Sequence, residues 1–180
     1  MKIITDIDDV VKDLHGFIFH QIHQVTGELI KREAFNDWDI FAKLSPGLTA
    51  IKDHWMAKEG TVTALQTLPG ALETLETLRS KHHVIAVTSP YSESKTWVWE
   101  RQIDLKNLGF KKHDTVFSSG KFHVPADVFI DDCPENCISW HQAHPDKLCC
   151  LVTYPNTENV ELPPKVKRIK ALSEILDIIM

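Results

Sequence analysis

The stretch KIITDID, residues 2–8, places two carboxylates directly after a short apolar run. A run of this length, rich in isoleucine and ended by polar residues, predicts a buried strand that stops before Asp6. Similar runs, rich in Val, Ile and Phe, predict further strands along the chain, at residues 83–88, 115–118, 128–130 and 148–152.

Helical patterns separate these strands. Pro69 and Gly70 precede a helix over 71–80, in which leucines recur at helical spacing. Further helices are predicted from a cap at Ser92 or Ser94 to about 108, from 134 to about 143, and over 171–179. Strands that alternate with helices predict a parallel sheet covered on both faces. The expected fold class is therefore α/β, a Rossmann-like three-layer parallel sheet.

The stretch 11–68 interrupts this alternation. It contains no convincing strand, while Leu14, Ile18 and Ile22 mark one face of an amphipathic helix. It is also far too long for a simple strand-to-helix connection. We expect a small helical cap inserted after the first strand, over residues 11–68, with residues 1–10 and 69–180 forming the core.

Composition narrows the classes of partner. The chain has 180 residues and a formal net charge of -5, with its basic residues spread along the sequence. We therefore expect neither a nucleic-acid polymer nor a membrane as partner. No export signal or CxxC pair occurs, so reduced thiols and a cytoplasmic location are expected. The sequence leaves a homodimer open.

Polar side chains follow four of the predicted strands. The carboxyl ends of parallel strands lie on one edge of a sheet, where ligands bind in such folds. Taken singly, each feature has a simpler explanation, such as a helix cap or a solvent-facing lysine. Their joint occurrence at strand ends is hard to explain by core packing. The set comprises Asp6 and Asp8, Thr88 and Ser89, Lys121, and Asp131 and Asp132.

These residue types suit phosphoryl transfer. Carboxylate oxygens bind Mg²⁺, which neutralises a phosphate dianion, and Asp6 with one or both of Asp131 and Asp132 would hold it. Asp6 would then attack phosphorus and form an aspartyl-phosphate. Asp8 would protonate the leaving alkoxide and afterwards deprotonate the attacking water. The hydroxyls of 88–89 and the ammonium of Lys121 would bind phosphoryl oxygens.

The same elements resemble the four motifs of the haloacid dehalogenase superfamily. IITDIDDV at 3–10 is similar to the first motif, VTS at 87–89 to the second, Lys121 to the third, and IDD at 130–132 to the fourth. Within the superfamily the chain is most similar to the 5'(3')-deoxyribonucleotidases. That likeness rests on LPGAL at 68–72, TSP at 88–90, KTWV at 95–98, and the placement of Lys121 ten positions before Asp131.

The resemblance implies a Mg²⁺-dependent phosphatase for a nucleoside 5'- or 3'-monophosphate, with deoxyribonucleotides preferred. It places Mg²⁺ on Asp6, on the backbone carbonyl of Asp8 and on Asp132, with Asp131 close behind. It also implies that Lys95 reaches the phosphate, although an exposed lysine in the first helical turn is an equal alternative.

Two positions depart from the resembled group. Asp9 stands where the group commonly has glycine, which adds a negative charge near the metal. Cys133 stands where these nucleotidases tend to carry arginine, and loss of that cation bears on substrate specificity more than on the chemistry.

Three aromatic residues of the expected cap, Phe17, Trp38 and Phe41, lie where the family positions aromatic side chains against the nucleobase. We favour packing within the cap as their role, because aromatic side chains dominate cores. Two other functions stay open: the same chemistry on another small metabolite such as a sugar phosphate, and a catalytically silent nucleotide-binding module. Asp8 argues against the silent module, since binding alone needs no acid–base group.

Overall fold

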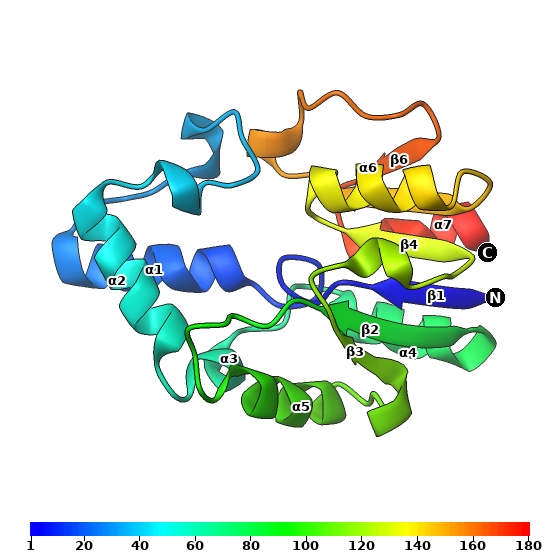
Figure 1. The fold of residues 1–180 in the computed structure, drawn as a ribbon, viewed down its shortest axis with the longest axis horizontal. Helices are drawn as coiled ribbons and strands as arrows, with labels where there is room; N and C mark the ends of the chain where they lie inside the picture. The colour runs from blue at the N-terminus through cyan, green and yellow to red at the C-terminus, as the bar shows by residue number, and fades with distance from the viewer.

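A computed structural model describes all 180 residues and contains one six-stranded sheet with helices on both faces (Figure 1). The strand order is β3-β2-β1-β4-β5-β6, and every neighbouring pair is parallel. This confirms the predicted α/β class. The strands are β1 (Lys2–Thr5), β2 (His83–Thr88), β3 (Thr115–Phe117), β4 (Val128–Asp131), β5 (Leu148–Val152) and β6 (Val166–Ile169).

Four α-helices accompany the sheet, and three more lie in the stretch between β1 and β2. The first group comprises α4 (Ala71–Lys81), α5 (Trp97–Asn107), α6 (Pro134–Ala143) and α7 (Ile175–Ile179). The second group comprises α1 (Leu14–Thr26), α2 (Pro46–Ala57) and α3 (Thr61–Ala64). Short 3-10 turns occupy Arg32–Ala34, Phe41–Lys43, Lys112–Asp114, Lys121–His123, Pro155–Thr157 and Leu172–Glu174.

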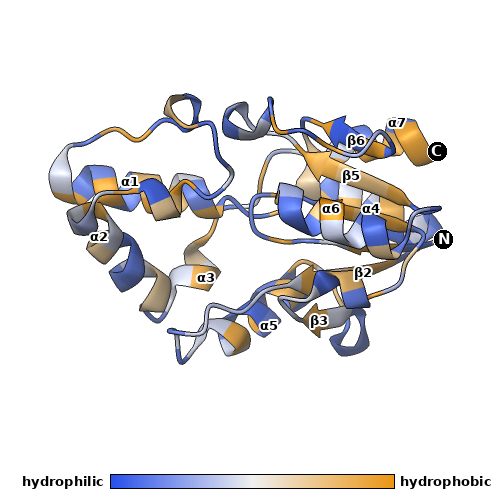
Figure 2. Cartoon of the chain, turned by 45° about the horizontal axis from the view of Figure 1, so that its top comes forward, coloured by the Kyte–Doolittle hydropathy of each residue, from blue (hydrophilic) through white to orange (hydrophobic).

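Both faces of the sheet are buried. Ile3 of β1 packs in the cluster that includes α4 and α7, whereas the next residue, Ile4, packs in the cluster that includes α6. Strands buried on both faces carry continuous apolar runs, and these runs made them recognisable in the sequence. Figure 2 shows the resulting band of hydrophobic residues along the strands between the helices.

The stretch 11–68 has a hydrophobic cluster of its own, built mainly from α1, α2 and α3. Trp97 of α5 is part of this cluster, so α5 packs against the inserted stretch as well as the sheet. The two ends of the stretch lie side by side. Lys12 and Thr67 form an antiparallel bridge, and the amide of Leu68 donates to the carbonyl of Val11 (2.8 Å). In Figure 1 the helices of this stretch lie beyond the carboxyl end of β1.

Three local differences separate the structure from the sequence predictions. The edge strand β6 was missed, because its central residues Lys167 and Arg168 are exposed and charged. The helix expected over 171–179 is a 3-10 turn followed by the short α7. Helix α5 begins at Trp97, although Ser94 accepts the amide of Trp97 through its hydroxyl (3.2 Å). None of the helices combines the length and apolar character that crossing a bilayer requires.

Candidate active site

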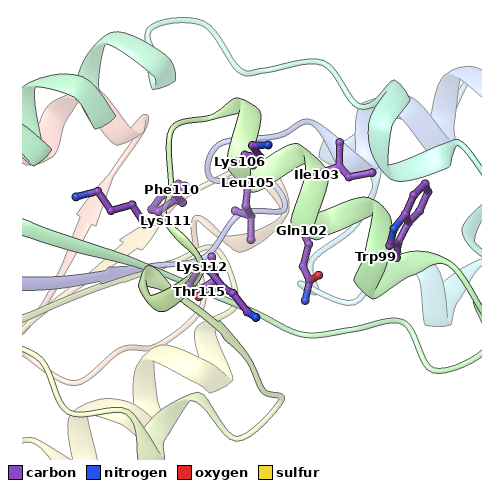
Figure 3. A pocket seen from close by; sticks show the side chains of 9 residues that line it. All are labelled: Trp99, Gln102, Ile103, Leu105, Lys106, Phe110, Lys111, Lys112 and Thr115. Atoms are coloured by element: carbon purple, nitrogen blue, oxygen red, sulfur yellow. Dashed lines mark hydrogen bonds between the residues drawn. The ribbon is translucent and has the colours of Figure 1, made fainter.

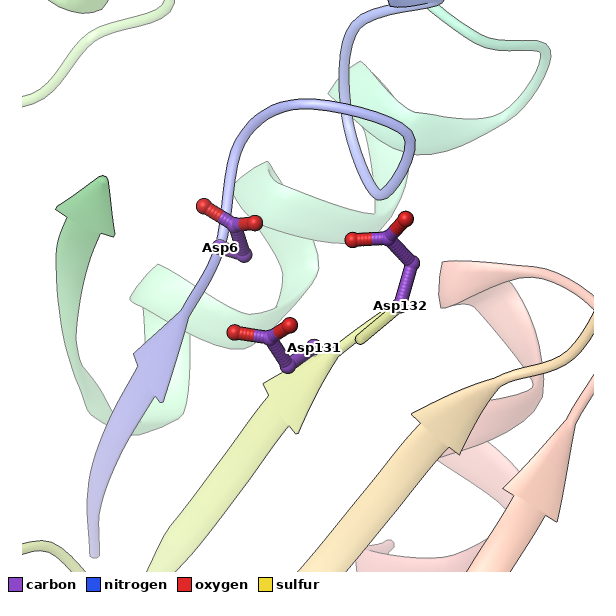
Figure 4. Close-up of side chains that lie close together, drawn as sticks. All are labelled: Asp6, Asp131 and Asp132. Atoms are coloured by element: carbon purple, nitrogen blue, oxygen red, sulfur yellow. The ribbon is translucent and has the colours of Figure 1, made fainter. Parts of the chain in front are cut away.

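The carboxyl ends of β1 and β4 bring three carboxylates together. Asp6 directly follows β1, Asp131 ends β4, and Asp132 comes next in the chain (Figure 4). Their ligand oxygens all lie within 4.8 Å of one another, and all three residues are buried. Thr88 ends the neighbouring strand β2, so residues far apart in the sequence meet at one edge of the sheet.

Lys121 links two of these carboxylates. It opens the 3-10 turn that follows β3, and its ammonium lies 2.8 Å from Asp6 Oδ2 and 2.8 Å from Asp131 Oδ2. Lys121 is only 2% exposed, which excludes the alternative of a solvent-facing lysine. Asp131 also accepts the amide of Cys133 (2.8 Å) and the side-chain amide of Asn136 (3.1 and 3.2 Å). Asp131 is thus saturated with donors and holds Lys121 beside Asp6.

Asp132 differs from Asp131 in its partners. Its only hydrogen-bond donor is the indole Nε1–H of Trp38, at 3.0 Å from Oδ2. Asp6 and Asp132 therefore keep oxygen lone pairs that no protein group uses. An all-oxygen donor set of this kind fits a hard divalent cation such as Mg²⁺.

The electrostatics of the cluster point the same way. Burial raises the pKa of Asp6 to about 7, although Lys121 opposes the shift. Burial also raises the pKa of Asp132 well above its ordinary value, and the neighbouring carboxylates add to this rise. For Lys121, burial alone would lower the pKa, but Asp131 and Asp6 outweigh it and raise the pKa. Three buried carboxylates share one cation, a deficit of positive charge that a metal ion would offset.

Asp8 lines the same cavity as Asp6. One of its oxygens, Oδ1, accepts a hydrogen bond from the guanidinium of the buried Arg101. Burial raises the pKa of Asp8 above its ordinary value, and Arg101 opposes that rise. A carboxyl group with a raised pKa beside a nucleophile is suited to proton transfer.

The family model of the 5' nucleotidase, deoxy (pyrimidine), cytosolic type C protein matches residues 1–180. The chain belongs to this family. It is a phosphoric monoester hydrolase of the nucleotidase type, and the predicted resemblance to the deoxyribonucleotidases is confirmed. No curated protein matches the chain.

Solved haloacid dehalogenase-like hydrolases share the fold of this nucleotidase. One from Streptococcus pneumoniae has a TM-score of 0.63 at 15% identity, over 99% of this chain and 98% of its own. One from Bacillus subtilis, bound to magnesium, has a TM-score of 0.62 at 14% identity, over 98% and 97%. The D,D-heptose 1,7-bisphosphate phosphatase of Burkholderia thailandensis has a TM-score of 0.56 at 12% identity, over 98% and 97%. At these identities the likeness concerns the fold alone.

The other three side chains predicted to bind the substrate phosphate differ in their surroundings. The hydroxyl of Thr88 is fully buried and has no hydrogen-bond partner in the protein. Ser89 lines the cavity, and its hydroxyl donates weakly to the carbonyl of Ser118 (3.3 Å). Lys95 is exposed, makes no ion pair or hydrogen bond, and does not line the cavity. The structure thus brings Thr88 and Ser89 to the site and leaves Lys95 outside it.

The cavity has a volume of about 260 Å³ and a mixed lining. Polar residues such as Asp6, Asp8 and Lys121 line it together with aromatic and apolar ones. Trp38 and Phe41 line it, so packing alone does not describe them. Phe17 does not line it and instead packs edge-on against Trp55, with ring centroids 5.9 Å apart. The aromatic and apolar lining residues include Leu14, His15, Trp38, Phe41, Met56, Tyr91 and Trp97.

Asp9 adopts a left-handed backbone conformation with φ of 55°, which explains why glycine suits this position. Its carboxylate accepts a hydrogen bond from Arg32 Nη2 (2.6 Å) and contacts His15 Nδ1 (2.5 Å). These two partners compensate the negative charge that Asp9 adds. Burial alone would raise the pKa of Asp9, but His15 and Arg32 outweigh it and lower the pKa. Arg32 stacks on Tyr154 (3.7 Å), and His15 stacks on Phe41 (4.3 Å between centroids).

Several site residues were not found from the sequence. Arg101 and Asn136 lie on helices whose patterns give no sign of a role, and their partners are known only from packing. Cys133 is buried beside Glu135 (3.2 Å) and supplies no cation, as its departure from the group suggested. A separate cavity of about 280 Å³ is lined by residues of α5 and of the segment that follows it, from Trp99 to Thr115, and contains none of the predicted site residues (Figure 3).

Proposed function

We propose that this nucleotidase is a Mg²⁺-dependent phosphatase that hydrolyses a nucleoside 5'- or 3'-monophosphate, preferring deoxyribonucleotides, through an aspartyl-phosphate on Asp6. The observation that carries the proposal is the meeting of Asp6, Asp132 and Lys121 in a cavity that aromatic side chains also line. We place the enzyme in the cytoplasm, in line with the cytosolic type named in the family description.

Mg²⁺ would be held by Asp6, the backbone carbonyl of Asp8, and Asp132. When bound, it neutralises the charge of the phosphate and lets an anionic nucleophile approach. Asp131 would act indirectly, because its Oδ2 holds the ammonium of Lys121 at 2.8 Å. Lys121 and Thr88 would bind the phosphoryl oxygens, and Thr88 supports this role because its buried hydroxyl has no other partner. We assign Lys95 no role in this proposal, because it does not line the cavity.

The reaction would proceed in two halves. In the first, a carboxylate oxygen of Asp6 bonds to phosphorus, the bond from phosphorus to the leaving oxygen breaks, and Asp8 gives that oxygen its proton. In the second, Asp8 takes a proton from water as the water oxygen bonds to phosphorus. The bond to Asp6 then breaks and inorganic phosphate leaves. Both carboxylates return to their starting states, so one pair of aspartates serves both halves.

The substrate class follows from the aromatic lining of the cavity. Trp38, which is bonded to Asp132, and Phe41 line the same cavity as Asp6 and Asp8, so the sugar and base of a bound mononucleotide would meet aromatic side chains there. Stacking of a base on an aromatic ring contributes about 1–3 kcal/mol. We propose that residues 11–68 act as a cap that supplies this surface, and that residues 1–10 and 69–180 form the catalytic core.

The test is phosphate release from a panel of nucleoside 5'- and 3'-monophosphates and sugar phosphates, with Mg²⁺ and with chelator. We expect turnover of deoxynucleotides that chelator abolishes, no turnover by Asp6→Asn, and normal turnover by the exposed control Asp177→Asn. Turnover of sugar phosphates alone would favour the alternative substrate. Absence of any turnover, with nucleotide binding retained, would favour the silent binding module and overturn the proposal.

A further inference from the structure

A buried guanidinium lies directly behind Asp8. Arg101 is 0% exposed and belongs to α5. One of its nitrogens, Nη2, donates to Asp8 Oδ1, and the other, Nη1, donates to Asp104 Oδ2 (3.1 Å). A guanidinium stays charged under all conditions, so its burial requires anionic partners on fixed positions.

The position of Arg101 is set by a neutral quartet of charged groups, of which Arg101, Lys12 and Asp104 are buried and Asp8 is partly buried. Asp104 lies between two cations, since its Oδ1 contacts the ammonium of Lys12 (2.8 Å) while its Oδ2 accepts from Arg101. Lys12 also donates to the carbonyl of Leu65 (3.2 Å). With Asp8, the quartet has two anions and two cations. Asp104 therefore fixes one side of the guanidinium, which leaves the other side aimed at Asp8.

The helical turn of α5 that carries Arg101 is held in place by the neighbouring residue, Glu100. The carboxylate of Glu100, the residue before Arg101, accepts the amides of Gly60 (3.0 Å) and Val62 (3.1 Å). These amides belong to the part of the inserted stretch that returns to the core. The turn of α5 that carries Arg101 is thus anchored to the inserted stretch, and its side chains have little freedom to shift.

The hydrogen bond to Arg101 leaves Asp8 with one fixed and one free oxygen. Oδ1 is occupied, whereas Oδ2 has no partner in the protein, and Asp8 lines the cavity beside Asp6. We propose that Arg101 is a positioning residue, which fixes the carboxyl plane of Asp8 so that Oδ2 faces the leaving oxygen of the substrate. This inference rests on the proposed function, because it assigns a partner to the acid–base group of that reaction.

The experiment compares two substrates that differ in their need for a proton. The leaving oxygen of a nucleoside monophosphate requires protonation, whereas nitrophenolate departs from p-nitrophenyl phosphate as an anion. For Arg101→Lys and Arg101→Met we expect kcat/KM for the nucleotide to fall about 100-fold, the range of general acid catalysis. The value for p-nitrophenyl phosphate should fall by less than about fivefold in the same variants. The control Arg79→Met, whose guanidinium lies over Phe110 (4.9 Å), should leave both values unchanged.

A double variant separates positioning from folding. On the Asp8→Asn background, Arg101→Lys should have no further effect on kcat/KM for either substrate, because Arg101 acts through Asp8. Arg101→Lys keeps the buried positive charge, so it serves where Arg101→Met does not fold. An equal fall for both substrates, or a further fall on the Asp8→Asn background, would overturn the inference while leaving the proposed function intact. Absence of turnover in the wild-type enzyme would overturn both.

Discussion

The stability of the magnesium-free enzyme should decrease as the pH rises from 5 to 8. Burial raises the pKa of Asp6 to about 7 in the folded protein, from an ordinary value of 3.8. A carboxyl group with a raised folded-state pKa holds its proton more tightly in the folded state than in the unfolded one. It therefore favours folding at low pH, and this contribution is lost as the pH climbs toward the folded-state pKa.

The size of the effect follows from the shift. One pKa unit corresponds to about 1.4 kcal/mol, so the interval from pH 5 to 7 represents a loss of roughly 3 kcal/mol in the free energy of unfolding through Asp6. Asp132 and Asp8 act in the same direction, because burial raises the pKa of each. Asp9 does not oppose them, since its pKa is lowered and it titrates below this interval.

The assay is urea unfolding followed by circular dichroism at pH 5 and pH 8, with chelator and with excess Mg²⁺. Asp6→Asn should remove at least half of the loss, whereas the exposed control Asp177→Asn should keep all of it. Mg²⁺ should stabilise the enzyme more at pH 8 than at pH 5, because it competes with protons for the same oxygens. A magnesium-free stability that is equal or higher at pH 8, or a full loss in Asp6→Asn, would refute the reasoning.

Three substitutions, the third with a matched control, extend these expectations to other parts of the site. Asp8→Asn should lower turnover at least 100-fold yet keep Mg²⁺-dependent nucleotide binding in equilibrium dialysis; lost binding would contradict its role. Thr88→Val should reduce kcat/KM about tenfold with an unchanged or higher melting temperature, because the buried hydroxyl has no partner to lose. Phe41→Leu should raise KM for nucleotide roughly tenfold through lost stacking, whereas Phe17→Leu should change only the melting temperature. Similar KM values for the two phenylalanine variants would refute the proposed contact between Phe41 and the nucleotide.

The fold was predictable because its strands are buried on both faces. Residues 83–88 and 148–152 read as continuous apolar runs, and the structure places them in the interior of the sheet. The strand Val166–Ile169 could not be recognised in this way. It lies at the edge of the sheet, and its exposed Lys167 and Arg168 break the apolar pattern.

The centre of the site was predictable for a geometric reason, and its surroundings were not. Asp6, Lys121 and Asp132 all follow strands of one parallel sheet, so the topology alone brings them near one another. Arg101 is 93 positions from Asp8, and their contact depends on which face α5 turns toward the sheet. The pairing of Arg32 with Asp9 depends likewise on how the inserted stretch packs. No spacing in the sequence encodes either contact.

The central claim is that Asp6 carries the phosphoryl group during turnover. The most direct measurement is an acid-quenched reaction with ³²P-labelled deoxynucleotide and Mg²⁺, followed by borohydride reduction and peptide mass spectrometry. We predict protein-bound label in the wild-type enzyme and conversion of residue 6 to homoserine, with neither in Asp6→Asn. Label on another residue, or nucleotide hydrolysis without any protein-bound phosphate, would contradict the account.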